Sequence, residues 1–343
     1  MVLIKGGQVV DPKRQEAFLA DVVLGDGKIV GIGVYEDDGT YETVMDARGC
    51  VVAPGLIDVH VHFRDPGLTY KEDIGTGARA AAAGGFTTVV CMANTKPPVD
   101  QVETLRYVLE EGKKTGIHVL SCAAISVGMK GKELTDMEQL KEAGAAGFTD
   151  DGIPLMDESL VVEAMKEAAR LDVPLSFHEE NPVFIQNSGI HHGAVSERLG
   201  IYGALALAED SLVARDCMIA LHTGARVNIQ HISSKNSVEL VRMAKRLGAR
   251  VTAEVTPHHF TLTQEAVLEK GTLAKMNPPL RTEEDRMALI EGLRDGTIDM
   301  IATDHAPHSM EEKRKQLTEA PSGIIGLETA LALGITELVE NGY

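Results

Sequence analysis

The segment that decides the fold is residues 54–64, PGLIDVHVHFR, in which an apolar strand follows a Pro-Gly turn and ends in polar side chains. Downstream, short apolar runs keep alternating with segments of helical periodicity. The expected strands span residues 56–61, 87–92, 117–124, 145–149, 173–177, 227–230, 250–255 and 298–302. Continuous apolar strands that alternate with helices indicate a parallel sheet covered on both faces. Eight such units in about 250 residues predict a (β/α)8 barrel of the TIM type, with an open doubly wound sheet as the alternative.

The N-terminal 52 residues have a different pattern. Short apolar runs at residues 2–4, 9–10, 21–24 and 28–32 are separated by glycine turns, and Asp26-Gly27 is a strong hairpin signal. We therefore expect a small all-β domain over residues 1–52 and the barrel over residues 53–343. The last expected helix, residues 327–340, is followed by no strand. The β domain is thus expected to lack a C-terminal complement.

The composition excludes several classes of protein. The chain has 343 residues with 33 Lys plus Arg and 51 Asp plus Glu, so its net charge is −18. Such a chain repels phosphate backbones, which argues against a nucleic-acid partner. No apolar run reaches the ~20 residues that span a bilayer, which argues against a membrane protein. The four cysteines form no Cys-x-x-Cys pair, which favours a reducing cytoplasm over a disulfide framework.

Polar side chains of the metal-ligand type end five of the expected strands. His60 and His62 point to the same face of the first strand because side chains alternate along it. The other four strand ends carry Asp150 and Asp151, His178, His231, and Asp304. Barrel closure brings these ends to one rim, where barrel enzymes place their sites. Imidazoles and carboxylates without thiolates favour a two-metal zinc site, with Mn²⁺ or Co²⁺ as substitutes. The pattern alone leaves open which of the two adjacent aspartates bridges the metals.

These motifs together resemble the amidohydrolase superfamily and, within it, the type I dihydroorotases. The resemblance runs along the whole chain and rests on residues 60–67 (HVHFRDPG), 92–98 (MANTKPP), 148–152 (FTDDG), 275–281 (KMNPPLR) and 303–308 (TDHAPH). Two positions depart from the family pattern, which more often has proline at Ala93 and phenylalanine at Ser322. Neither departure removes a ligand.

The resemblance implies two Zn²⁺ ions per chain, bridged by Asp151 and a hydroxide. The implied ligands are His60 and His62 for one ion, His178 and His231 for the other, with Asp151 between them and Asp304 as a further ligand. Asp304 also matches the catalytic acid/base of the family. Many members of the superfamily bridge their metals through a carboxylated lysine, whereas the type I enzymes use aspartate, and no lysine ends the fourth strand here.

The resemblance also implies the reversible cyclisation of N-carbamoyl-L-aspartate to L-dihydroorotate, a step of pyrimidine biosynthesis. The implied substrate-binding residues are His62, together with Arg64, Asn94 and His308 for the substrate carboxylate, and Asn277 with the main chain of Ser322 and Gly323 near the ring. A guanidinium can hold a carboxylate through two parallel hydrogen bonds. Salt screens the distant surface charge beyond ~8–10 Å, so the acidic chain does not preclude an anionic substrate.

Two alternatives remain open. One is another cyclic-amide hydrolase of the allantoinase or hydantoinase type, although these usually carry the bridging lysine. The other is a non-catalytic dihydroorotase-like subunit of aspartate carbamoyltransferase, although such relatives lose ligands that this chain keeps. Among partners, a homodimer and an association with aspartate carbamoyltransferase also stay open.

One further motif, Gly75-Thr76-Gly77-Ala78-Arg79-Ala80, matches the G-x-G-x-x-A spacing of dinucleotide-binding proteins. Such a fingerprint should directly follow a strand, and this one continues into an alanine-rich helix. We interpret it as close helix packing.

Overall fold

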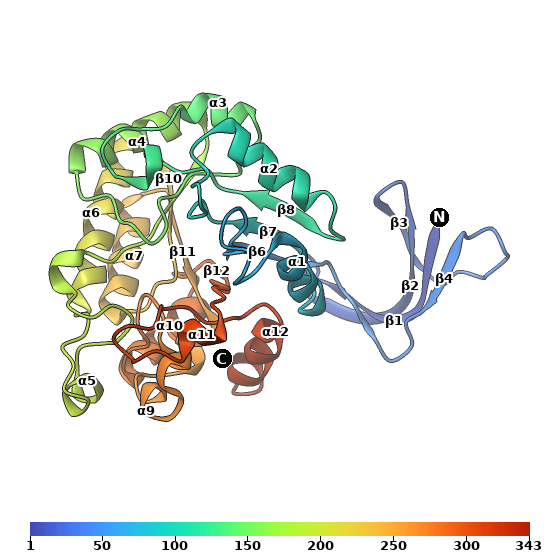
Figure 1. Ribbon diagram of the computed structural model, residues 1–343. Coiled ribbons are helices and arrows are strands. Elements are labelled where there is room, and N and C mark those ends of the chain that lie inside the picture. The colour runs from blue at the N-terminus through green and yellow to red at the C-terminus, as the bar shows by residue number, and fades with distance from the viewer. The chain divides into compact units, whose positions relative to one another are not determined.

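The computed structural model describes all 343 residues, which divide into two compact units, Met1–Leu56 and Ile57–Tyr343. The N-terminal unit is a five-stranded sheet of β1 (Val2–Asp11), β2 (Glu16–Gly25), β3 (Lys28–Gly33), β4 (Thr43–Asp46) and β5 (Val51–Val52) (Figure 1). The strand order is β3-β2-β1-β4, and β5 also pairs with β1. The two hairpins β1–β2 and β2–β3 are antiparallel, whereas β4 and β5 run parallel to β1.

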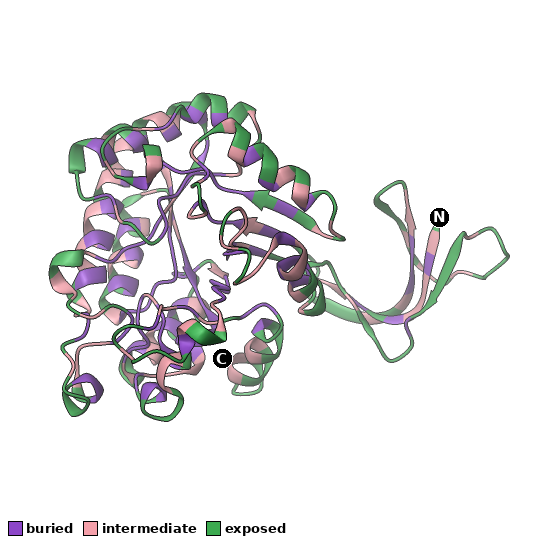
Figure 2. Ribbon diagram, in the orientation of Figure 1, coloured by how far each residue is buried: buried purple, intermediate pink, exposed green.

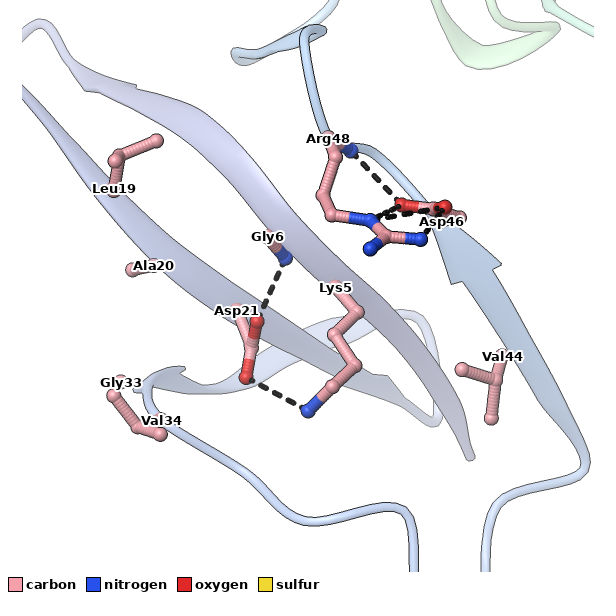
Figure 3. A pocket seen from close by; sticks show the side chains of 10 residues that line it. All are labelled: Lys5, Gly6, Leu19, Ala20, Asp21, Gly33, Val34, Val44, Asp46 and Arg48. Carbon is pink, nitrogen blue, oxygen red and sulfur yellow. Dashed lines mark hydrogen bonds and ion pairs between the residues drawn. The ribbon is translucent and has the colours of Figure 1, made fainter.

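The N-terminal unit contains a hollow of about 570 Å³ between its strands (Figure 3). The two carboxylates that line it are already engaged. Asp21 accepts hydrogen bonds from the backbone N–H groups of Gly6 (2.7 Å) and Tyr35 (2.9 Å), and Asp46 forms an ion pair with Arg48 at 2.6 Å. The hollow therefore offers no free group for chemistry.

The second unit is a ring of parallel strands with helices around it (Figure 1). Its strands are β6 (Leu56–Val61), β7 (Phe86–Cys91), β8 (His118–Ser121), β9 (Pro174–Phe177), β10 (Arg226–Ile229), β11 (Val251–Val255) and β12 (Met300–Ile301). They form two sheets, β6-β7-β8 and β12-β11-β10-β9. Phe148 bridges Ala123 on one side and Leu175 on the other, and His305 bridges Val61. These bridges close the ring, so the predicted barrel is confirmed and the open sheet is excluded.

Four expected elements are shorter than their sequence pattern suggests. The strands expected over residues 117–124 and 298–302 are β8 (His118–Ser121) and β12 (Met300–Ile301). The fourth barrel position, expected as a strand over residues 145–149, is reduced to the bridges at Phe148. Its backbone hydrogen-bonds to the segments that contain β8 and β9 only over residues 146–149. The expected helix over residues 327–340 is a short α12 (Ala330–Leu333) followed by a π-helical segment, η4 (Gly334–Val339). Glycine at the junction is a poor helix former, which favours the change of helix type there.

Most of the other helices cover the barrel and place their apolar faces against it, whereas α5 and α9 pack in a separate apolar cluster. They are α1 (Ile74–Ala83), α2 (Val102–Gly112), α3 (Met137–Glu142), α4 (Glu158–Leu171), α5 (Ala194–Arg198), α6 (Leu207–Thr223), α7 (Lys235–Leu247), α8 (Pro257–Thr261), α9 (Ala266–Lys270), α10 (Glu283–Arg294) and α11 (Met310–Lys313), with 3₁₀ turns η1 (Val127–Met129), η2 (Pro182–Phe184) and η3 (Gly271–Ala274). Helix α4 shows the pattern, since Val161, Ala164, Met165 and Ala168 are buried at helical spacing. Figure 2 shows buried residues along the strands and exposed residues on the outer helix faces.

No helix has the length and apolar character needed to cross a membrane.

Helix α1 contains the Gly75–Ala80 motif, and its packing explains the second glycine. Asp73 caps the helix by accepting a hydrogen bond from the Thr76 N–H at 2.7 Å. Gly77 is buried against Phe63, where a Cβ atom would lie 2.3 Å from the ring. Close helix packing is therefore the role of this glycine.

We expect Gly77→Ala to destabilise the chain by about 1–3 kcal/mol, the usual cost of overpacking a filled core. The added methyl group must displace Phe63, which directly follows His62. Urea unfolding measures the loss, with Gly116→Ala as the matched control, because a Cβ there meets nothing within 4 Å. Equal stability of the two variants would contradict the packing role.

Candidate metal centre

Two triads of metal-ligand side chains share one carboxylate at the C-terminal ends of the barrel strands. His60, His62 and Asp151 form the first triad, and Asp151, His178 and His231 form the second. Within each triad the ligand atoms lie within 4.8 Å of one another, and all five residues are buried. Side chains that are far apart in the sequence thus meet where the predicted barrel brings strand ends together.

The Asp151 carboxylate faces both triads. Its Oδ1 atom lies 3.5 Å from Nε2 of His60 and 3.5 Å from Nδ1 of His178, and its Oδ2 atom lies 3.4 Å from Nε2 of His62. Burial would raise the pKa of this carboxyl, but the neighbouring histidines lower it well below its usual range. Asp151 is therefore ionised and has the position that a bridging ligand requires.

The adjacent Asp150 has a different role. Its Oδ1 atom accepts hydrogen bonds from the backbone N–H groups of Ile125 (2.8 Å) and Ser126 (3.1 Å), and the Ser126 hydroxyl donates to Oδ2. Asp150 therefore orders the loop that follows β8 and belongs to neither triad. The sequence left the choice between these aspartates open, and only Asp151 reaches the histidines.

Asp304 lies beside the first triad, in the segment that follows β12. Its Oδ1 atom is 2.9 Å from Nε2 of His62 and 3.5 Å from Nε2 of His60. Burial raises the pKa of Asp304, but His60 and His62 outweigh this effect and lower it to about 2. Asp304 also has a positive φ of 48°. Such strained conformations are concentrated at functional sites. The geometry gives an ionised carboxylate that can accept a proton at the centre.

Carboxylates hold two of the histidines from outside the triads. Nδ1 of His60 lies 2.5 Å from Oε1 of Glu254, and Nε2 of His178 lies 2.9 Å from Oε2 of Glu180. An acceptor at one ring nitrogen places the proton there and leaves a lone pair on the other, as metal-binding histidines require. Nε2 of His60 is buried and has no hydrogen-bond partner. This orphaned atom and the nitrogen and oxygen donor set fit a divalent metal ion.

Asn94 contacts the triads through both ends of its amide. Its Oδ1 atom lies 2.9 Å from Nδ1 of His62, and its Nδ2 group donates to Oδ2 of Asp151 at 3.0 Å. The sequence analysis placed Asn94 with the substrate carboxylate. Its contacts give it an additional role, because it orients one ligand of the first triad and the shared aspartate.

A cavity of about 150 Å³ opens over the two triads. It is lined by His62, Arg64, Asn94, Asp151, Gly152, His178, His231, Asn277, Asp304, Ala306, His308, Ser322 and Gly323. Every site residue expected from the sequence lies in this lining except His60, which is buried beneath it. The structure therefore brings the expected residues together in one place.

One cationic side chain, Arg64, lines the cavity beside His308. Arg64 donates from Nε to the Pro307 carbonyl at 3.3 Å, and its Nη2 group is 3.4 Å from Nε2 of His308, while Nη1 makes no hydrogen bond within the chain. Burial lowers the pKa of His308, and Arg64 and Lys71 lower it further, to about 3. The neutral ring can then accept a hydrogen bond from Lys71 at Nδ1 and donate one to the Ser322 carbonyl at Nε2.

The expected ring-contacting residues are partly engaged with other groups of the chain. Asn277 accepts a hydrogen bond from the Ser188 hydroxyl at 2.8 Å, and the Gly323 N–H donates to the Lys275 carbonyl at 2.9 Å. The Ser322 N–H and the Gly323 carbonyl have no partner within the chain. These two groups stay available to a ligand.

Two buried acids next to the ligands were not predicted from the sequence. Glu254 contacts His60, and Asp58 accepts hydrogen bonds from the backbone N–H groups of His60 (3.1 Å) and Thr303 (3.2 Å). Each is the only carboxylate in a mainly apolar strand, LIDVHV or VTAEV. A buried carboxylate needs donors, so its presence in such a strand was a usable signal.

Comparisons with known proteins agree with this geometry. A family model described as "Dihydro-orotase-like" matches residues 49–237. A dihydroorotase of Clostridioides difficile is 62% identical over 343 residues, which are 100% of this chain and 82% of that protein. A dihydroorotase of Clostridium acetobutylicum is 55% identical over 344 residues, covering 100% and 81% of the two chains. Among solved structures, an L-hydantoinase (dihydropyrimidinase) of Arthrobacter aurescens is 25% identical with a TM-score of 0.84, and the match covers 99% of this chain and 78% of that one.

Proposed function

Since the chain belongs to the dihydroorotase family, we propose that its two triads bind two divalent metal ions, with zinc as the expected metal, and that Asp304 is the catalytic acid/base. The chain is a metal-dependent cyclic amide hydrolase of pyrimidine biosynthesis. Its reaction interconverts N-carbamoyl-L-aspartate and L-dihydroorotate. The observation that carries the two-metal proposal is that one ionised carboxylate, Asp151, is shared by both triads.

The ligands are supplied by the ends of three strands, β6, β9 and β10, and by one bridging aspartate. His60 and His62 would hold one ion, His178 and His231 the other, and Asp151 both. Once bound, divalent ions at these triads would lower the pKa of a water molecule toward neutrality and polarise the carbonyl group of the cyclic amide.

Asp304 would move the proton of the reaction. In the hydrolytic direction, the oxygen of water forms a bond to the ring carbonyl carbon, and Asp304 accepts the proton that the water loses. The C–N bond of the ring then breaks, and Asp304 donates this proton to the departing ring nitrogen. In the biosynthetic direction the same steps run in reverse. Asp304 lines the cavity, and its Oδ1 atom lies 2.9 Å from Nε2 of His62.

The substrate would bind by its carboxylate on the Arg64 side of the cavity. Arg64 keeps Nη1 free, and its planar guanidinium suits a carboxylate. We propose that His308 holds the Ser322 loop in place through its 2.8 Å hydrogen bond, lies beside Arg64 and also contacts the carboxylate. Asn277 and the free main-chain groups of Ser322 and Gly323 would contact the ring.

We expect Arg64→Met to raise KM for dihydroorotate by about 10–100-fold, the loss of one charge-assisted contact of about 1.5–3 kcal/mol. The turnover number should fall much less, because Arg64 belongs to neither triad. Steady-state kinetics measure both constants, with the exposed Arg79→Met as the matched control. An unchanged KM in Arg64→Met would contradict the proposed carboxylate clamp.

A substrate comparison tests the proposed activity against its main rival. Hydantoinases share the fold, as the Arthrobacter enzyme does. The hydantoin ring and allantoin lack the carboxylate that Arg64 would bind. Purified chain should hydrolyse dihydroorotate far faster than either of these amides. Faster hydrolysis of hydantoin or allantoin would overturn the proposal.

We further propose that the enzyme acts in the cytoplasm, because its four cysteines are all free. A homodimer and an association with aspartate carbamoyltransferase are additional proposals that rest on the family resemblance. Sedimentation of the chain alone and mixed with that transferase tests both.

A further inference from the structure

Strand β11 supplies no ligand to either triad, yet it carries a carboxylate between them. The Glu254 side chain is 1% exposed. Its Oε1 atom lies 2.5 Å from Nδ1 of His60, in the first triad, and accepts the backbone N–H of His231, in the second triad, at 3.2 Å. One oxygen atom therefore contacts a residue from each triad.

The other oxygen of Glu254 is fixed by side chains inside the barrel. The Asn228 amide donates to Oε2 of Glu254 at 3.0 Å and to the Ser176 hydroxyl at 2.9 Å, and the Thr252 hydroxyl donates to Oδ1 of Asn228 at 3.1 Å. These three residues belong to the neighbouring strands β9, β10 and β11 and line a separate cavity of about 210 Å³. Asn228 thus holds Oε2 of Glu254, while Oε1 contacts His60 and His231.

The backbone at His231 needs this support. His231 has a positive φ of 29°, which is unfavourable for a residue with a side chain. Its N–H is held by the Glu254 side chain, and the following Ile232 N–H donates to the Glu254 main-chain carbonyl at 2.8 Å. Glu254 therefore fixes the turn that aims the His231 ring at the second triad.

A buried carboxylate is costly, and Glu254 has no lysine or arginine partner. The contacts that compensate its charge come from His60, His231 and Asn228. We infer that Glu254 is a positioning residue for both metal sites: it sets the tautomer and orientation of His60 and the backbone of His231. This inference rests on the proposed two-metal function.

Metal affinity tests the inference without relying on activity. Metal-stripped Glu254→Gln should bind zinc about 10–100-fold more weakly at both sites, the usual effect of losing an outer partner of a metal ligand. Competition with a chromophoric chelator measures both dissociation constants. Glu209→Gln is the control, because Glu209 is a similarly buried carboxylate that accepts the Ser233 and Ser234 backbone N–H groups and pairs with Arg281 but contacts no ligand side chain. The control should keep wild-type affinity at both sites.

Three results would overturn the inference: wild-type affinity in Glu254→Gln, an equal loss of affinity in Glu209→Gln, or a loss confined to one site. If the wild-type chain itself bound no metal, the proposed function would fail instead. Should Glu254→Gln not fold, Asn228→Ala decides the question, because it removes the hydrogen bond to Oε2 of Glu254 and leaves both contacts of Oε1 in place. That variant should lose affinity at both sites by a smaller factor, and an unchanged affinity would overturn the inference.

Discussion

Asp151→Asn is expected to lose both metal ions and to lower the turnover number by at least about 10³-fold, since metal chemistry and proton transfer together supply most of the rate enhancement. Asp151 is the one ligand common to the two triads. An asparagine amide carries no charge and cannot compensate two divalent ions. Metal analysis of the dialysed variant and its dihydroorotate hydrolysis rate check the two parts of this expectation.

Asp150→Asn provides the matched comparison at the neighbouring position. It should keep both metals, because the Asp150 carboxylate binds the Ile125 and Ser126 backbone instead of the histidines. The free energy of unfolding should fall by about 1–3 kcal/mol, the cost of weakening a buried hydrogen-bonded carboxylate. If Asp150→Asn lost the metals while Asp151→Asn kept them, the assignment of the bridging ligand would be wrong.

The second large effect is expected at Asp304. Asp304→Asn should lower the turnover number by about 10²–10⁴-fold, the range that a positioned general acid/base contributes. Both triads remain complete without Asp304, so most of the bound metal should stay. Steady-state kinetics and metal analysis on the same sample separate loss of proton transfer from loss of metal.

Asp299→Asn is a suitable control for Asp304→Asn. Asp299 directly precedes β12, accepts hydrogen bonds from Lys245 and the Ala253 N–H, and belongs to neither triad. Its substitution should leave the turnover number nearly unchanged. Turnover by Asp304→Asn within a factor of a few of wild type would remove Asp304 from the proposed mechanism.

Much of the barrel follows from the sequence because its strands are continuous apolar runs with polar ends. Leu56–Val61 begins and ends where the pattern places it. The fourth strand does not, because the bridges at Phe148 depend on how the neighbouring strands close the ring. A local pattern carries no information about such closure.

The site was predictable where a ligand ends a strand and unpredictable where a contact joins distant strands. His60 and His62 share a face by simple alternation. Asp150 and Asp151 are adjacent, so only the conformation of the loop decides which one faces the histidines. Glu254 lies 194 residues from His60, and barrel closure alone brings the two together.

The central claim is that two metal ions, held by triads that share Asp151, drive dihydroorotate hydrolysis. The most direct measurement adds zinc stepwise to metal-stripped chain and follows bound metal and turnover in the same sample. The account predicts that turnover rises with zinc and levels off at two ions per chain. Full turnover without metal, or saturation of activity at a single ion, would contradict it.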